Sequence, residues 1–157
     1  MKLLIKQRIL SWTDAYKVLD EHYHKKYEVR AELISLTHQL HVYDAHCRQL
    51  GVVREKLLAV LPTFTLEIGG RSCGRVSKQW TLLAPRYELN YFGWTVKGDC
   101  LAWNYEVFEG RRRVAHIHKE FLAWTDTYVI DIADPADELP ALMLVIAIDA
   151  VNCTDHH

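Results

Sequence analysis

Apolar and polar residues alternate in four pairs of short segments that share one layout along the chain. In the first segment of each pair, two apolar residues flank one polar residue, as in a strand with one buried face. The first segments are residues 16–18, 40–42, 64–66 and 105–107. The second segments begin ten or eleven positions after the first segments end, at residues 29–33, 53–57, 76–80 and 117–121. This spacing predicts four antiparallel hairpins, with Ile117 and Phe121 of the last one facing the core.

The corners between consecutive hairpins repeat as well. The apolar residue seven places after the end of each second segment starts the next strand, and the four such residues are Leu40, Phe64, Tyr87 and Tyr128. Turn-favouring residues stand two places before Tyr16, Phe64, Tyr87 and Tyr128: Asp14, Pro62, Pro85 and Asp126. Residues 90–99 form a shorter hairpin with a different register. The chain is therefore predicted to be a meander of about a dozen strands.

A sheet of that length exposes two edges unless it closes, so the pattern predicts a closed antiparallel barrel. About twelve strands leave a lumen that needs filling. Residues 139–148 are apolar all round, and a helix of that kind has no face for water. We therefore predict a mainly β fold, a closed barrel of about twelve strands around a buried C-terminal α-helix. It forms one domain, 1–157, with strands over about 3–132 and the helix over about 135–151.

The start of this helix carries its own signals. Asp134 is the predicted N-cap, and Pro135 suits the first helical position. Pro140 removes a backbone hydrogen bond, which predicts a kink or a helix that effectively begins there. The apolar run ends at Asp149, short of the roughly 20 residues that cross a bilayer, which argues against a transmembrane helix.

Composition narrows the expected setting of the protein. The formal net charge of −1 provides no global attraction for nucleic acid or acidic membranes. The four cysteines lack Cys-x-x-Cys spacing, and the N-terminal apolar run is broken by charge at Lys6, unlike a signal peptide. We expect a cytoplasmic protein with reduced thiols. The tryptophans are interpreted as core and corner packing, because no line of basic charge accompanies them as in a nucleic-acid groove.

Three motifs carry a resemblance to a known family. They are the paired Trp-Thr-Asp-x-Tyr motifs at Trp12 and Trp124, the segment 61–70, and the segment 131–139 that runs into Leu142-Met143-Leu144. With these motifs the chain resembles the LOR family over almost its whole length. The resemblance implies the tubby-like fold shared with phospholipid scramblases, a twelve-stranded barrel threaded by its terminal helix. Tubby domains bind phosphoinositide head groups, but their lipid-binding residues do not map onto identifiable positions here.

Basic residues in the predicted hairpin turns are the first candidate site. Equivalent turns of a meander lie at the same rim, and arginine suits bidentate contact with phosphate. The candidates for an anionic ligand are Lys25, Lys26, Arg48, Arg71, Arg111, Arg112 and Arg113. They predict a non-enzymatic binding module for an anionic lipid head group or a phosphorylated small molecule. The alternative without a ligand is that exposed turns carry charge for solubility.

An enzyme or metal protein is the alternative function. His116 and His118 are spaced to share a strand face, and His22 and His24 fall in the first predicted turn, but no further ligand completes a metal shell. Neither a nucleophile elbow nor a phosphate-binding glycine loop is present. His46 and Cys47 are the nearest approach to a nucleophile pair, and a turn is their expected place. Asp149 is expected to be a partnered structural carboxylate, so we assign no catalytic residue, metal or cofactor.

Overall fold

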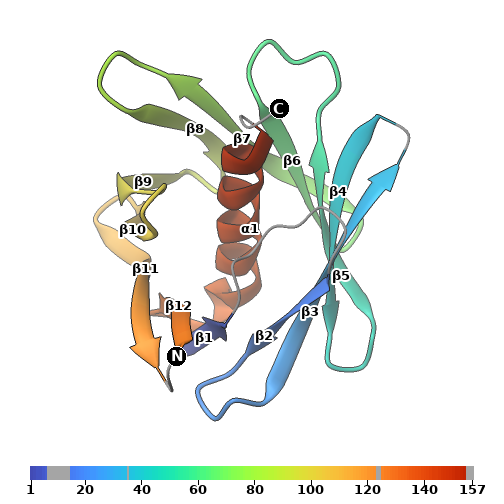
Figure 1. The fold of residues 1–157 in the computed structure, drawn as a ribbon, viewed down its shortest axis with the longest axis vertical. Helices are drawn as coiled ribbons and strands as arrows, with labels where there is room; N and C mark the ends of the chain where they lie inside the picture. The colour runs from blue at the N-terminus through green and yellow to red at the C-terminus, as the bar shows by residue number, and fades with distance from the viewer. Residues whose placement is uncertain (7–14, 35, 123–124, 155–157) are drawn as a thin grey trace.

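The structure is a computed structural model that describes residues 1–6, 15–34, 36–122 and 125–154. Its described residues form twelve strands, one 3-10 turn and one α-helix (Figure 1). The strands are β1 (Lys2–Ile5), β2 (Ala15–Leu19), β3 (Lys25–Ile34), β4 (Thr37–Asp44), β5 (Gln49–Glu55), β6 (Thr63–Ile68), β7 (Arg71–Trp80), β8 (Pro85–Tyr91), β9 (Trp94–Asp99), β10 (Asn104–Glu109), β11 (Arg112–Leu122) and β12 (Thr125–Ile132). The 3-10 turn η1 (Pro135–Asp137) leads into α1 (Glu138–Thr154).

The predicted hairpins have a common register. In every pair, the leading apolar residue of the first strand lies opposite the leading residue of the second. These partners are Tyr16↔Val29, Leu40↔Val53, Phe64↔Val76 and Tyr105↔Ile117. All of them are buried, because their side chains share the face that points into the barrel. The repeat in the sequence is therefore a repeat in the structure.

The sheet curls around α1 and is antiparallel throughout. Neighbouring strands follow the order β8-β7-β6-β5-β4-β3-β2-β1-β12-β11-β10-β9, so the first and last strands of the chain pair with each other. Met1 and Ile132 add two backbone hydrogen bonds to that pair, of 3.1 and 2.8 Å. The ring remains open at one place, between β8 and β9, and the barrel is thus nearly closed rather than closed.

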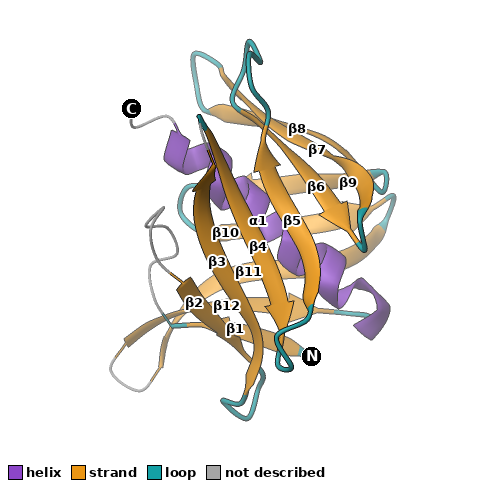
Figure 2. Ribbon diagram, turned by 90° about the vertical axis from the view of Figure 1, so that its right-hand side faces the viewer, coloured by secondary structure: helices purple, strands orange, loops and turns teal. Residues whose placement is uncertain are grey.

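The helix fills the barrel, as Figure 2 shows. Its residues 141–148 are all buried, which agrees with the absence of a polar stripe. The Asp134 side chain accepts a hydrogen bond from the Ala136 amide, and Pro140 lies in the first turn of α1, where its missing N–H costs nothing. Gly51 lets β5 approach the helix, since a Cβ there would lie 2.7 Å from Met143 Cε.

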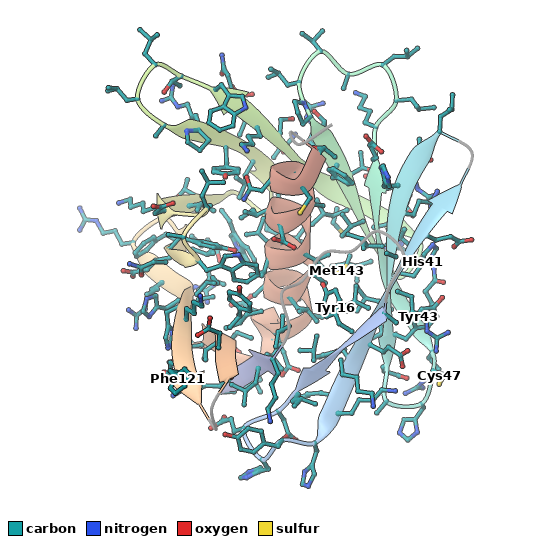
Figure 3. The ribbon with its side chains drawn as sticks, in the orientation of Figure 1. Tyr16, His41, Tyr43, Cys47, Phe121 and Met143 are labelled. Carbon is teal, nitrogen blue, oxygen red and sulfur yellow. The ribbon has the colours of Figure 1, made fainter. Side chains whose placement is uncertain are left out.

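Parts of the predicted pattern were wrong at the strand ends. The strand predicted over 53–57 ends at Glu55, and Leu57 lies exposed in the following loop. Ile117 is buried as expected, but Phe121 is 69% exposed. Period-two alternation continues to Phe121, yet β11 extends past the part of the barrel that α1 fills (Figure 3). Trp80 is likewise exposed, whereas Trp94 is core; Trp12 and Trp124 lie outside the described residues.

Candidate binding surfaces of the barrel

The barrel has two kinds of connection, and they lie at opposite rims. The tight turns 20–24, 45–48, 69–70, 92–93 and 110–111 surround the N-terminal end of α1, and we call them the hairpin rim. The corner loops that the structure describes lie at the other rim. Two of them, 56–62 and 81–84, project together beyond the C-terminal end of the helix in Figure 1, and we call these the apolar loop pair.

The predicted basic residues lie on the hairpin rim or at the strand ends beside it, and most of them have carboxylate partners. Lys25 pairs with Glu28 at 2.7 Å and Arg48 with Asp44 at 2.8 Å, whereas Arg113 reaches Glu106 at 3.5 Å. Lys26 pairs with Glu138 at 2.8 Å, and Arg112 pairs with both Glu109 and Asp137. These five cations thus form ion pairs within the protein.

Two of these pairs anchor the N-terminal end of the helix. Glu138 is the first residue of α1, is buried, and accepts hydrogen bonds from Tyr27 Oη at 2.6 Å and Lys26 Nζ at 2.9 Å. Burial, reinforced by the Glu138 carboxylate, raises the pKa of Tyr27 well above its ordinary value, so its hydroxyl stays a donor. Arg112 Nη1 holds Asp137 of η1 at 2.7 Å. Three carboxylate contacts therefore tie β3 and β11 to the helix.

Arg71 and Arg111 differ from the other candidates. Both are exposed, and neither forms an ion pair with any residue that the structure describes. Arg71 follows the turn 69–70 and Arg111 lies in the turn 110–111, so they belong to separate hairpins. Of the seven predicted anion contacts, these two keep the charge that a phosphate could use.

The described histidines lie in turns and on strands at separate places. Among the described residues, no three His, Cys, Asp or Glu side chains gather as potential ligands. His116 and His118 stack on β11 with ring centroids 4.6 Å apart, and His118 Nε2 lies 2.7 Å from Glu120. His22 and His24 are exposed in a turn and bond Asp20 through their backbone amides.

His46 and Cys47 occupy the equivalent turn between β4 and β5. The His46 amide donates to Asp44 Oδ1 at 2.8 Å, and Cys47 has a left-handed backbone with φ +62°. Both side chains are exposed, and Figure 3 shows Cys47 at the tip of the hairpin. No general base is in contact with this thiol in the described part of the chain. The two residues thus form an exposed turn.

The apolar loop pair is a surface that the search for basic residues in the sequence did not identify. Its residues are Lys-Leu-Leu-Ala-Val-Leu-Pro at 56–62 and Thr-Leu-Leu-Ala at 81–84. Leu58, Val60, Leu82 and Leu83 have relative exposures of 97–105%, so they touch almost nothing of their own chain. The Lys78 amide donates to Pro62 O at 3.0 Å, which joins the first loop to the strand that leads into the second. The hairpin rim carries only Tyr23 and Phe92 as exposed large hydrophobic residues among those described.

A cleft of about 580 Å³ lies beside the second loop, where β8 and β9 diverge. Its volume falls within the range of small-ligand pockets. The lining comes from β7, β8 and β9 and the loops that follow β7 and β9: Trp80, Thr81, Leu82, Leu83, Ala84, Pro85, Tyr87, Gly98, Asp99, Cys100 and Leu101. Burial, with a contribution from Asp99, raises the pKa of Cys100 to about 12, so that thiol stays protonated.

The fold and these surfaces define a nearly closed antiparallel barrel around a central helix. The family profile described as LOR, LURP-one-related, matches residues 1–149, and the chain belongs to this family. It is 26% identical over 155 residues to the uncharacterized protein YxjI of Bacillus subtilis (strain 168), covering 99% of this chain and 96% of that protein.

A solved structure has the same fold. The X-ray structure of an Arabidopsis thaliana protein, AT5G01750, superposes with a TM-score of 0.61 at 14% sequence identity. The match covers 94% of this chain and 90% of the plant chain. Separately, no helix within the described ranges has both the length and the hydropathy to cross a bilayer.

Proposed function

We propose that the protein is a non-enzymatic binding module that docks reversibly on phospholipid membrane surfaces through the apolar loop pair. The observation that carries the proposal is the full exposure of Leu58, Val60, Leu82 and Leu83 on two adjacent loop tips. Exposed apolar side chains gathered in this way mark contact with a membrane or another protein. Lys56 is the one charged residue in the two loops.

The shape of the surface favours a membrane over a folded protein partner. The exposed side chains stand on two separate projections rather than on a flat face, and a fluid bilayer adapts to such projections. Trp80 lies at the base of the second loop with Lys78 Nζ 4.4 Å from its ring centroid. A tryptophan with an apolar body and a polar edge suits the interface between head groups and acyl chains.

The expected affinity is modest. Complete burial of a leucine or valine side chain contributes about 1.5–3 kcal/mol. Partial immersion of four or five such residues gives several kcal/mol, from which the cost of association is subtracted. The net free energy of binding is comparable to that of a single acyl anchor, which binds membranes marginally and reversibly. The protein would therefore exchange between the membrane and solution.

An anionic ligand at Arg71 and Arg111 is the second candidate function. It is favoured by the exposure of both guanidinium groups and by the lack of ion pairs between them and any described residue. The two residues lie on the hairpin rim, opposite the apolar loop pair, so the two surfaces cannot meet the same flat membrane. Salt separates the candidates, because screening weakens contacts between charges and leaves apolar contacts intact.

Vesicle flotation tests both candidates. We expect the wild-type protein to float with phosphatidylcholine vesicles and with vesicles that also contain phosphatidylserine, at low and at high salt. The double variant Leu58→Asp, Val60→Asp should lose about tenfold or more of this binding. Tyr23→Asp is the matched control, because it places the same charge at an exposed apolar residue of the hairpin rim.

Two results would contradict membrane docking by the loops. One is wild-type protein that floats with neither kind of vesicle. The other is binding that survives Leu58→Asp, Val60→Asp, is abolished by high salt, and is lost in the double variant Arg71→Glu, Arg111→Glu. The second result would instead assign binding to the hairpin rim.

A further inference from the structure

The opening between β8 and β9 leaves two strands with one strand neighbour each. β8 pairs only with β7, and β9 only with β10, in the sheet that the described residues form. An edge strand presents a row of backbone N–H and C=O groups that can pair with another chain. Here two such edges face each other across one seam.

Contacts with the helix keep β8 in place without a second strand. Tyr91 Oη donates to Pro140 O at 2.8 Å, near the start of α1, and Tyr87 Oη donates to Asn152 Oδ1 at 2.5 Å, near its end. Tyr91 also packs edge-on against Trp94, with ring centroids 5.5 Å apart, where the hairpin turn joins the two strands. The seam is therefore closed at its turn and open at the corner rim.

The cleft lies at this open end. Pro85 and Tyr87 of β8 line one side, whereas Gly98 and Asp99 of β9 line the other. Gly98 has φ +118°, and a Cβ there would lie 2.6 Å from Asn104 O, so close packing of β9 on β10 requires glycine. A consequence is that β9 presents backbone without a side chain at this point of the lining.

The backbone at the seam determines what can fill it. The Lys78 amide bonds Pro62 O on the β6 side, so the pair Lys78↔Tyr87 is not hydrogen-bonded across β7 and β8. Backbone groups alternate in direction along a strand, and Leu89 therefore also turns its N–H and C=O towards the seam. An acyl chain would cover the Leu89 backbone groups without bonding them, which is costly.

An extended peptide fits both the backbone edges of the seam and the apolar side chains of the cleft. Its backbone can pair with the edges of β8 and β9, while its apolar side chains contact Trp80, Leu83 and Leu101. Asp99 is the charged residue of the lining, and it favours a basic residue at the end of the peptide that lies beside it. We propose that the seam binds an extended, apolar segment of a partner protein, with a basic residue beside Asp99.

The proposal does not rest on membrane docking. Leu58 and Val60, which carry the flotation test, are not part of the cleft lining. The double variant Leu58→Asp, Val60→Asp should therefore bind peptide like the wild type, and either proposal can fail alone.

Fluorescence anisotropy with labelled six-residue peptides provides the test. The probe alternates valine and threonine and carries lysine at one end, and a second probe carries it at the other. We expect one of the two to bind, with hydrogen exchange in β8 and β9 slowed in the complex. Asp99→Asn keeps an acceptor for the Ala102 amide and should weaken binding about three- to tenfold. The matched control Glu88→Gln, on β8 outside the lining, should change nothing.

Three outcomes would overturn the proposal. The first is no binding of either probe at about 1 mM, where even weak contacts are measurable. The second is equal binding of a probe with proline at alternate positions, which cannot donate to a strand edge. The third is displacement of the peptide by palmitate without slowed exchange in β8 and β9, which would assign the cleft to an acyl chain.

Discussion

The hairpin rim and the apolar loop pair are built by the same repeat, yet they use their residues in opposite ways. On the hairpin rim, most charged side chains pair with one another or with residues at the start of the helix, as in Lys26 with Glu138 and Arg112 with Asp137. On the apolar loop pair, Leu58 and Leu82 turn outward and contact little of the chain. Most of the charge at the first rim thus contributes to the fold, whereas the apolar residues at the second remain exposed.

Two of the hairpin turns show how closely the first rim is specified. Asp20 and Asp44 each accept two backbone hydrogen bonds from the residues two and four places later. Tyr23 and Cys47 occupy the same left-handed position, with φ of +64° and +62°. The repeat therefore extends to the turn geometry, where an aspartate side chain replaces a backbone acceptor.

The largest expected effect is on the helix anchor of the hairpin rim. Glu138→Ala should lower the free energy of unfolding by about 2–4 kcal/mol, because Tyr27 and Lys26 lose their shared acceptor in a buried site. Urea denaturation measures the loss. Arg113→Ala is the control, since its exposed 3.5 Å contact with Glu106 should contribute about 0.5 kcal/mol or less. Equal losses in the two variants would mean that the rim charges do not hold the helix.

The sequence was sufficient for the fold where one periodicity governed many residues. Strand pairs such as Leu40↔Val53 follow from alternation, and the central helix follows from a run with no polar face. The same alternation wrongly predicted Leu57 in a strand and Phe121 in the core. A local pattern carries no information about how far the enclosed core extends along the strands. Strand ends depend on where the helix fills the barrel, which is a tertiary property.

The candidate surfaces were less predictable, for a related reason. Counting cations located Lys26 and Arg112 on the correct rim, but not the distant carboxylates of Glu138 and Asp137 that pair with them. The seam between β8 and β9 arises where a strand pair is missing, and no residue type marks that absence. The apolar runs at 57–61 and 82–83, in corners where polar residues are usual, were the signal for the apolar loop pair.

A smaller effect is expected from the two aspartate turns. Backbone hydrogen bonds from His24 and His22 lower the pKa of Asp20, and those from Arg48 and His46 do the same for Asp44. Since the folded pKa is below the unfolded value of 3.8, each carboxylate stabilises the protein above about pH 4 and loses this effect as pH falls through the folded pKa.

The double variant Asp20→Asn, Asp44→Asn isolates this contribution. Asparagine retains an acceptor but not the charge, so the variant should melt lower than the wild type at neutral pH. Thermal unfolding followed downward in pH should show the two midpoints converging below about pH 4. A difference that persists at the lowest pH would assign the loss to turn geometry rather than to ionisation.

The smallest effect on stability is expected where the apolar exposure is greatest. The variant Leu58→Ser, Leu82→Ser, Leu83→Ser removes three side chains that the fold does not pack, so its free energy of unfolding should stay within about 0.5 kcal/mol of the wild type. Its solubility should rise, because exposed apolar patches promote association. Urea denaturation and the protein concentration at the onset of light scattering measure the two quantities. A loss as large as that of Glu138→Ala would show that the loops pack within the fold, and it would remove the reason to assign them a partner.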